Sequence, residues 1–355
     1  MTGPQPPGPR PGAGATDGDT PPETGAREAP PCVGRRVLVT GASGMLGGAV
    51  ADLLAEHGWD VTVMQRRTAG GRHRESLGDI RDAEAVARAV RGQDAVVHLA
   101  AKVDVVGPWR DFVDVNVRGT RRVIEALRAQ GGGAMVQVSS PSVAHTGRSL
   151  AGSGAGAATP MRARGHYART KAAAELFALE ADSTDLAVTA LRPHLVWGPG
   201  DTQLVGRIVE RAHQGRLALV GSGTALVDTT YVDNAAAAIV AGLERIEVAH
   251  GQALVVTNGE PRPIGELIAD ICRAVGAPPP RLHLPVGLAW GLGAVVEGAV
   301  ALSERVPGLP AITQPPLTRF LAEQLSTAHW FDQRQTRDVL DWRPAVSIDD
   351  GLTRL

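Results

Sequence analysis

The chain of 355 residues contains only two cysteines, Cys32 and Cys272, which lie far apart in the sequence. This scarcity excludes a disulfide framework, a zinc knuckle and a CxxC redox pair, and it favours the reducing cytoplasm as the location. No apolar segment follows Met1, so we expect no secretory signal. The longest apolar run, about residues 282–296, is interrupted by glycine and falls short of the ~20 residues that span a bilayer, so we expect no integral membrane segment.

Charge of either sign is nearly balanced, with a formal net charge of −1. A balanced chain lacks the basic surplus that draws a protein to nucleic acid, so we expect no nucleic-acid partner. The histidines are scattered and no carboxylates cluster beside them at ligand spacing, so we expect no metal site. Lysine is also scarce. Lys102 and Lys171 are the only lysines among 36 basic residues.

From Gly34 onward, short β-branched runs alternate with helical patterns. We expect strands over 36–40, 60–65, 95–99, 134–139 and 186–191, and helices over 49–56, 82–91, 115–128 and 167–179. Alternating strands and helices build a parallel sheet covered on both faces, so the prediction is an α/β, Rossmann-type doubly wound sheet. Prolines cluster in the last hundred residues, which predicts a smaller, less regular C-terminal part that binds the substrate.

Composition also predicts the domain boundaries. Residues 1–31 hold nine Pro and six Gly and almost no apolar side chains, so we expect residues 1–33 to form a disordered tail. We expect a dinucleotide-binding domain at 34–195, to which 224–257 returns, and a substrate-binding part at 196–223 and 258–355. In residues 143–166 the apolar residues recur with no regular period, which predicts a mobile or functional loop.

A glycine-rich turn joins the first strand to the first helix. TGASGMLG occupies residues 40–47 with GxxGxxG spacing. Glycine allows a tight turn and lets backbone amides approach a pyrophosphate, which a helix N-terminus also attracts. The alternative is a purely structural turn, but the strand before and the helix after supply the context of a dinucleotide loop. We therefore predict cofactor contacts from Gly41, Ser43, Gly44, Met45, Leu46 and Gly47.

The residues that end the second strand indicate which dinucleotide is bound. An acidic residue there would bond the ribose 2′-hydroxyl of NAD, but the chain has Gln65, Arg66 and Arg67. Guanidinium groups suit a 2′-phosphate, so Arg66 and Arg67 favour NADP(H), with NAD(H) still possible. Alternatively, these arginines are a solvated strand end. Asp79 and Ile80 are expected to flank the adenine.

Tyr167 and Lys171 form a YxxxK pair on an expected helix. Residues four apart share one helix face, so the phenol and the ammonium point the same way. A free tyrosine is a poor acid–base group at neutral pH, and a nearby cation lowers its pKa. The pair therefore predicts a phenol that exchanges a proton with a carbonyl or hydroxyl oxygen. The alternative, an exposed helix face, requires a chance pairing in a chain with two tyrosines and two lysines.

Hydroxyl and amide side chains are expected beside this pair. Ser139 and Ser140 end the preceding strand, and strand ends line the ligand crevice of a parallel sheet. Ser140 is the predicted partner of the tyrosine, with Ser139 or Ser142 as alternatives. Asn116, at the start of its helix, either anchors a water or a carbonyl near Lys171 or satisfies helix amides.

Several motifs occur in an order that resembles one family. They are TGASGMLG (40–47), VVHLAA (96–101), NVRGT (116–120), QVSSPSV (137–143), YARTK (167–171), LRPHLVWGPGD (191–201), TYVDN (230–234), WFD (330–332), LDWRP (340–344) and DGL (350–352). Together they resemble the extended short-chain dehydrogenase/reductases, which include the NAD-dependent epimerases and dehydratases. LRPHLVWGPGD and YVDN look most like the branch of 3β-hydroxysteroid dehydrogenases and bacterial 2-alkyl-3-oxoalkanoate reductases.

The resemblance implies an NAD(P)-dependent oxidoreductase that interconverts a ketone and a secondary alcohol. It implies that Ser140, Tyr167 and Lys171 form the catalytic triad, with tyrosine as the acid–base, lysine as cofactor anchor and serine holding the substrate oxygen. Asn116 is expected to act with them. The resemblance also implies that the segment from Arg192 onward passes the nicotinamide. The further expected cofactor contacts are Leu99, Ala100, Ala101, Pro193 and His194.

Leu195 bears on the substrate. Nucleotide-sugar epimerases and dehydratases of the family usually have an asparagine there, which contacts the nucleotide diphosphate. Leucine, together with the apolar 282–296 segment, favours a hydrophobic substrate such as a steroid, a 2-alkyl-3-oxo acid or a secondary metabolite. That segment is equally consistent with an ordinary core-facing helix. Ser142, Leu195 and Trp197 are the expected substrate contacts.

Two other functions stay open. One is a nucleotide-sugar epimerase or dehydratase with bound NAD, against which Leu195 argues. The other is a non-catalytic dinucleotide-binding regulator, which would not need the YxxxK pair. His145 and His166 are expected to be structural or exposed. A homodimer is expected by family analogy alone.

Overall fold

The structure is a computed structural model that describes residues 2–3, 34–68, 70–104, 106–305 and 317–355. Residues Pro31–Leu355 form one compact unit. The disordered tail expected at 1–33 lies outside the described residues, apart from residues 2–3.

A seven-stranded sheet organises this unit, and all its described strand pairs are parallel. The order across the sheet is β12-β7-β5-β4-β1-β2-β3, the doubly wound arrangement that the alternating pattern predicts. Central strands are buried on both faces because helices cover their β-branched runs. The strands are β1 Arg36–Thr40, β2 Asp60–Gln65, β3 Arg74–Leu77, β4 Ala95–His98, β5 Gly133–Val138, β7 Leu186–Pro193 and β12 Ala253–Val256.

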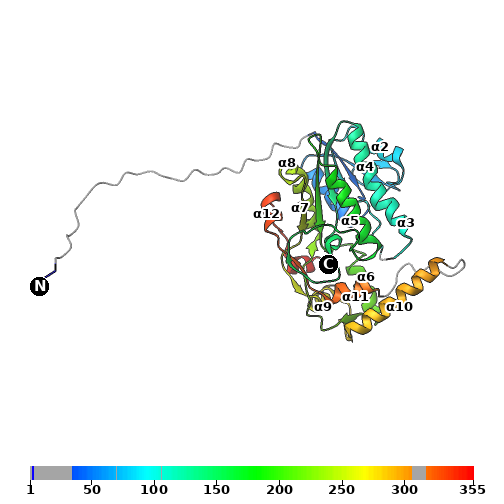
Figure 1. Cartoon of the computed structure of the whole chain (residues 1–355), viewed down its shortest axis with the longest axis vertical. Helices are drawn as coiled ribbons and strands as arrows, with labels where there is room; N and C mark the ends of the chain where they lie inside the picture. The colour runs from blue at the N-terminus through cyan, green and yellow to red at the C-terminus, as the bar shows by residue number, and fades with distance from the viewer. Residues whose placement is uncertain (1, 4–33, 69, 105, 306–316) are drawn as a thin grey trace. The chain divides into compact units, whose positions relative to one another are not determined.

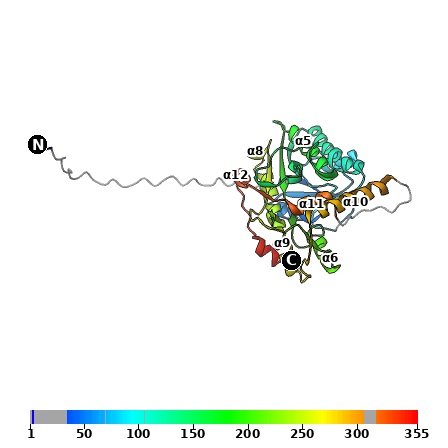
Figure 2. The same cartoon turned by 60° about the horizontal axis from the view of Figure 1, so that its bottom comes forward.

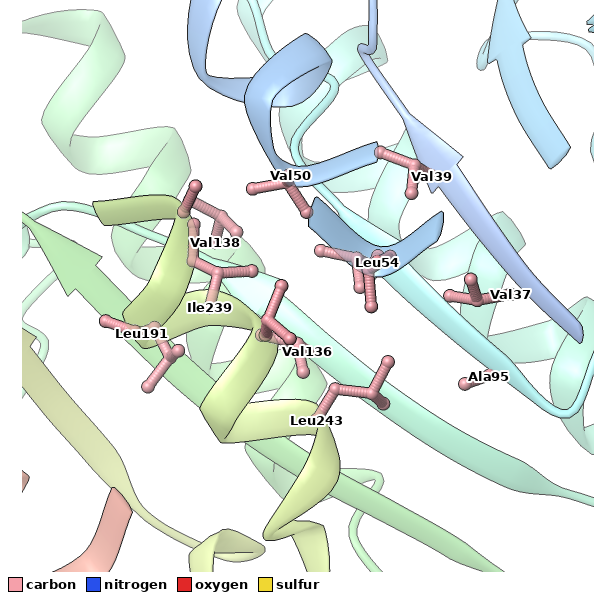
Figure 3. Close-up of a cluster of buried hydrophobic side chains, with 14 of the residues drawn as sticks. Val37, Val39, Val50, Leu54, Ala95, Val136, Val138, Leu191, Ile239 and Leu243 are labelled. Atoms are coloured by element: carbon pink, nitrogen blue, oxygen red, sulfur yellow. The ribbon is translucent and has the colours of Figure 1, made fainter. Parts of the chain in front are cut away.

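One face of the sheet is covered by α1 (Met45–Glu56) and α7 (Val232–Glu244). Figure 3 shows Leu54 of α1 and Leu243 of α7 in the same apolar layer as Val136 of β5. All three side chains are almost completely buried, which removes their apolar surface from water. This layer supports the strand ends from which the functional residues emerge.

The opposite face is covered by α2 (Ala83–Val90), α4 (Arg118–Ala129) and α5 (Gly165–Glu180). Figure 1 shows α4 and α5 on the other side of the sheet from α7. The helix expected at 115–128 is interrupted: a short α3 (Trp109–Phe112) and a π-helical turn (Val113–Val117) precede α4.

The remainder of the unit consists of short strands and of helices of various lengths. The strands are β6 Leu150–Ser153, β8 Val196–Trp197, β9 Ala218–Val220, β10 Leu226–Val227, β11 Thr230–Tyr231, β13 Arg262–Pro263, β14 Leu282–Leu284 and β15 His329–Phe331. The helices are the 3-10 turn η2 Pro141–Ala144, α6 Val205–His213, α8 Ile246–Ala249, α9 Ile264–Ala274, α10 Val286–Arg305, α11 Arg319–Ser326, α12 Arg334–Leu340 and α13 Ile348–Leu352.

The loop expected at 143–166 is partly regular. Its strand β6 pairs with β15, nearly 180 residues further along the chain, in the sheet β13-β10-β15-β6. This strand was not predicted, because its partner is remote in the sequence and no local pattern indicates it.

The apolar 282–296 segment forms β14 and the first half of α10, which lies beside α11 (Figure 2). Leu288, Leu292 and Val295 are exposed on α10. Among the described residues, the helices are too short or too polar to cross a membrane.

Candidate active site

A cavity of about 1130 Å³ lies at the carboxyl ends of the parallel strands. Residues at or just beyond the ends of β1, β4, β5 and β7 line it, among them Thr40, Leu99, Ser139 and Pro193. Open parallel sheets bind their ligands at this edge. The cavity is therefore the place to look for the residues that the sequence singles out.

The glycine turn between β1 and α1 lines one end of this cavity. Gly41 has a φ of +80°, and a Cβ there would come 2.8 Å from the amide nitrogen of Ala100. A Cβ on Gly47 would come 2.3 Å from the carbonyl oxygen of Gly41. Gly44 caps α1 without a side-chain hydrogen bond, so the first helix amides have no side-chain cap. Such amides bind phosphate, and the turn fits the pyrophosphate of a dinucleotide.

Gly47→Ala is expected to weaken binding of a nicotinamide dinucleotide on the order of tenfold or more, because the new Cβ displaces the Gly41 carbonyl and the adjoining amides. Gly48→Ala is the matched control. Its Cβ would lie 3.4 Å from the nearest carbonyl oxygen, and alanine favours a helix over glycine by about 0.5–1 kcal/mol. Titration with NADPH, followed by nucleotide fluorescence, measures both dissociation constants. Equal constants for the two variants would contradict the assignment of the turn.

Arginine and aspartate side chains line the cavity beside the end of β2. Arg66, Asp79 and Ile80 line it, whereas Arg67 does not. The guanidinium of Arg81 lies 2.8 Å from the Asp79 carboxylate and, through its hydrogen bond, lowers the pKa of that carboxyl. Arg81 also lines the cavity and was missed in the sequence, because the short strand β3 that precedes it was not predicted. Since Asp79 and Arg81 neutralise each other, Arg66 adds a net positive charge here.

A buried polar chain supports the turn. The ring of His98 is hydrogen-bonded to Thr40 Oγ1 (2.7 Å) and to Thr120 Oγ1 (3.1 Å). Burial lowers the pKa of His98 to about 3, so the ring is neutral. Thr40 Oγ1 also accepts from the amide of Ala100 at 3.1 Å. These bonds fix the 99–101 segment, all of which lines the cavity as expected for a cofactor wall.

Tyr167 and Lys171 lie one helical turn apart on α5, and both line the cavity. Ser140 lines the same cavity, and its hydroxyl is near enough to the phenol of Tyr167 to act on its pKa. Lys171 Nζ donates to the carbonyl oxygen of Val138 at 2.5 Å. Ser142 Oγ donates to Ser140 Oγ at 3.0 Å, which leaves Ser140 free to donate its own proton. The structure thus brings the predicted serine, tyrosine and lysine together at one place in the cavity wall.

Burial dominates the protonation of this pair. It raises the pKa of the Tyr167 phenol, against the opposite effect of the Ser140 hydroxyl. It lowers the pKa of Lys171 to about 8, against the effect of the Glu175 carboxylate. The expectation of a lowered tyrosine pKa is therefore wrong here, because loss of solvation outweighs the lowering effect of Ser140. At neutral pH the phenol is protonated and the ammonium is charged, a state that suits proton donation to a carbonyl oxygen.

Asn116 lies outside the cavity lining and joins two of its walls. Its Oδ1 accepts from the Lys102 amide at 2.7 Å, while its Nδ2 donates to the Lys102 carbonyl at 3.1 Å and to Thr170 Oγ1 at 3.0 Å. Thr170 precedes Lys171 on α5. Asn116 is thus placed to position α5 rather than to touch substrate. Ser139 lines the cavity, and its buried hydroxyl has no hydrogen-bond partner among the described residues.

The segment after β7 forms another wall. Pro193, His194 and Leu195 line the cavity. Leu195 has a φ of +44°, a left-handed conformation that costs a leucine about 1–2 kcal/mol and that asparagine tolerates better. Trp197 does not line the cavity: it is fully buried, and its Nε1 donates to Thr229 Oγ1 at 2.9 Å. It supports the wall from behind.

Sequence reasoning missed the cavity residues that belong to the C-terminal part and to the loop after β5. They include His145, Leu204, Arg207, Phe320, Leu321, His329 and Phe331. The 282–296 segment, all of it described, contributes nothing to the lining, so it does not support the expectation of a hydrophobic substrate. In the described part of the chain, no group of three or more His, Cys, Asp or Glu side chains could hold a metal ion.

The chain matches a known protein family over more than half of its length. The NAD dependent epimerase/dehydratase family matches residues 37–257, from β1 to just past β12. The chain belongs to this family. It is 43% identical over 334 residues to the 2-alkyl-3-oxoalkanoate reductase of Stenotrophomonas maltophilia, covering 90% of this chain and 98% of that protein. It is 27% identical over 328 residues to the mouse (Mus musculus) sterol-4-alpha-carboxylate 3-dehydrogenase, decarboxylating, with 90% of each covered.

Solved structures agree in fold. UDP-glucuronic acid 4-epimerase from Bacillus cereus, solved in complex with NAD, superposes with a TM-score of 0.68 at 20% identity, covering 90% of this chain and 96% of that one. The resemblance to the extended short-chain dehydrogenase/reductases is confirmed by the family match and the relatives. This family member is an NAD(P)-dependent dehydrogenase/reductase that interconverts a ketone and an alcohol.

Proposed function

We propose that this enzyme interconverts a 3-oxo and a 3-hydroxy group on a hydrophobic carboxylic acid, with NADP(H) as its coenzyme. The observation that carries the proposal is that Ser140, Tyr167 and Lys171 line the same cavity as the glycine turn. The 43% identical relative, named as a 2-alkyl-3-oxoalkanoate reductase, supports the same reaction.

Each side chain of the triad has a defined task in this reaction. The protonated phenol of Tyr167 gives its proton to the substrate oxygen, and Ser140 donates a second hydrogen bond to that oxygen. Lys171, held at the Val138 carbonyl, keeps a positive charge one helical turn away and stabilises the phenolate that forms. The nicotinamide, when bound, supplies the hydride. In the oxidising direction the same groups take the proton from the alcohol.

The names of two relatives share a feature of the substrate. One refers to a 2-alkyl-3-oxoalkanoate, and the other to a sterol-4-alpha-carboxylate oxidised at position 3. In both names the carboxylate is attached to the carbon next to the one that carries the reacting oxygen. This common chemistry is our reason for proposing a 3-oxo acid rather than a simple ketone.

The walls of the cavity beyond the triad favour an apolar chain. Leu204, Phe320, Leu321 and Phe331 present hydrocarbon surface there. Burying an alkyl chain against them gains about 0.8 kcal/mol for each methylene group. A long alkyl substituent on the acid therefore fits this space better than a charged nucleotide does.

Incubation of the purified protein with NADPH and a 2-alkyl-3-oxo acid tests the proposal, with UDP-glucuronic acid and dTDP-glucose in parallel. We expect NADPH oxidation at 340 nm, a 3-hydroxy acid by mass spectrometry and unchanged nucleotide sugars. Conversion of a nucleotide sugar without net use of coenzyme would replace the proposal with an epimerase or dehydratase activity. Binding of NADPH without turnover of either class would favour a regulator.

Arg66→Ser is expected to raise the KM for NADPH about 10–100-fold and to leave the KM for NADH unchanged. A charge-assisted bond to a 2′-phosphate contributes about 1.5–3 kcal/mol, and Arg66 lines the cavity where that phosphate is expected. Arg67→Ser is the matched control, because Arg67 is adjacent in sequence but outside the lining. Steady-state kinetics with both coenzymes measures the difference. A protein that uses NADH as well as NADPH before any substitution would overturn the NADP(H) assignment.

A further inference from the structure

Three histidines line the cavity, and the reaction proposed above uses none of them. His145 directly follows the η2 turn, His194 follows β7 and His329 begins β15. Their rings meet edge to face, with 4.8 Å between the centroids of His145 and His329 and 5.9 Å between those of His194 and His329. Three segments remote in sequence thus build one imidazole cluster in the cavity wall.

His145 is the least satisfied member of this cluster. It is 1% exposed, and neither of its ring nitrogens has a hydrogen-bond partner among the described residues. In contrast, His194 Nδ1 donates to the Asp228 carbonyl at 2.6 Å, and His329 Nε2 is bonded to Thr327 Oγ1 at 2.8 Å. A buried polar group without a partner costs about 1–3 kcal/mol. A ligand group that supplies the partner at His145 recovers this cost.

The cluster carries no charge at neutral pH. Burial lowers the pKa of all three rings, to about 4 for His194 and about 3 for His329. The two charged groups that act on His145, Glu323 of α11 and Arg164 before α5, have opposite effects and lie 3.8 Å from each other. An uncharged, buried cluster cannot receive a carboxylate ion without a counter-charge. The simplest counter-charge is a proton taken from water.

We propose that His145, with His194 and His329 beside it, is the subsite for the carboxyl group of the substrate, and that the acid binds there together with one proton. The inference rests on the proposed function, because it requires a 3-oxo acid. Its position agrees with that chemistry. Ser142, three residues before His145, donates to Ser140, which holds the substrate oxygen. The carboxyl group is one carbon removed from the reacting carbon and must therefore lie close to Ser140.

Arg207 is the alternative partner for a carboxylate. It lines the cavity from α6, and its guanidinium donates to Gln203 at 3.0 Å. Arg207 is half-buried and belongs to α6. His145, in contrast, directly follows the η2 turn, which begins after Ser140 and contains Ser142. The observations therefore favour His145, and the experiment includes Arg207 as a competing outcome.

Selectivity for the acid over its methyl ester tests the subsite. His145→Phe keeps a ring of similar size but removes both nitrogens. We expect the KM for the 2-alkyl-3-oxo acid to rise about 10–100-fold, while the KM and kcat for the ester stay within about twofold. His145→Gln, which keeps a hydrogen-bond donor, is expected to lie between the two, and Arg207→Gln to keep the selectivity.

The outcomes separate the two proposals. A wild-type enzyme that reduces neither compound overturns the proposed function itself. Equal losses for acid and ester in His145→Phe overturn the subsite alone, because they indicate a structural role. Loss of selectivity in Arg207→Gln, with none in His145→Phe or His145→Gln, assigns the carboxyl group to Arg207 instead.

Proton uptake is a second, independent readout. Binding of a 2-alkyl-3-hydroxy acid to the enzyme–NADPH complex is measured by calorimetry in two buffers of different ionisation enthalpy. The acid and NADPH are both in their reduced forms, so neither can react with the other. We expect an uptake approaching one proton per site near pH 7 and an affinity that falls as pH rises, by at most about tenfold per pH unit. His145→Phe is expected to take up none. Binding of the acid to the wild-type enzyme without proton uptake would contradict the proposal.

Discussion

Tyr167→Phe is expected to lower kcat for ketone reduction by about 10²–10⁴-fold, because it removes the phenol that we propose gives a proton to the substrate oxygen beside Ser140. The fold and the binding of NADPH should not change, since the phenyl ring retains the packing of the phenol. Steady-state kinetics with a 2-alkyl-3-oxo acid, together with an NADPH titration, separates the chemical effect from binding.

Tyr231→Phe is the matched control for this variant, because Tyr231 is the only other tyrosine of the chain. It lies outside the cavity lining and packs edge to face on Trp197, with 5.4 Å between ring centroids. We expect its kcat to stay within about threefold of the wild-type value. A Tyr167→Phe enzyme that is as active as Tyr231→Phe would remove the phenol from the mechanism.

The pH dependence of reduction follows from the same pair. The pKa of Tyr167 is raised, so the phenol is protonated throughout the neutral range. Lys171, with a pKa of about 8, loses its charge as pH rises through that value. We therefore expect kcat/KM for reduction of the methyl ester, whose binding takes up no proton, to be level below about pH 8 and to fall above it.

Glu175→Gln is expected to lower the free energy of unfolding by about 3–5 kcal/mol, a large share of the 5–15 kcal/mol that stabilises most proteins. Glu175 and Arg192 are each about 1% exposed, and Arg192 Nε lies 2.8 Å from the Glu175 carboxylate. Arg192 also donates to the backbone carbonyls of Ala155 and Gly156. Neutralising Glu175 leaves a buried guanidinium without a counter-charge, and it loosens the segment that follows β6.

Urea denaturation measures this loss against a matched control, Glu125→Gln. Glu125 pairs with Arg121 at 2.8 Å one helical turn away, but both side chains are more than half exposed. Exposed pairs contribute about 0.2–1 kcal/mol. Replacing Glu175 and Arg192 together by methionine should recover most of the stability, since apolar residues can substitute for a buried pair. Equal losses in Glu175→Gln and Glu125→Gln would show that burial does not set the energy of this pair.

The sheet and the glycine turn could be predicted because their signals are local. The strands Arg36–Thr40 and Asp60–Gln65 have the expected bounds, since their β-branched runs end where the pattern ends. The first helix begins at Met45 rather than at residue 49. Gly47 and Gly48 made its first turn look irregular, although the close approach of Gly47 to Gly41 is what the turn requires.

Contacts between distant segments could not be predicted in this way. Strand β6 pairs with β15 across about half of the chain, and nothing near Leu150 in the sequence indicates its partner. The same pairing brings His329 to His145, so the histidine cluster was also missed. The apolar 282–296 segment indicates that a surface is hydrophobic but not which way that surface faces. Spacing placed Lys171 near Tyr167, yet it could not indicate that burial would raise the pKa of the phenol.

Transfer of deuterium from NADPH labelled at nicotinamide C4 to the substrate tests the central claim most directly. With a 2-alkyl-3-oxo acid and the coenzyme labelled on the transferred face, the wild-type enzyme should form a 3-hydroxy acid that carries one deuterium at C3, and Tyr167→Phe should form almost none. An unlabelled product, or equal labelled product from both enzymes, would contradict a reduction in which the Tyr167 phenol supplies the proton.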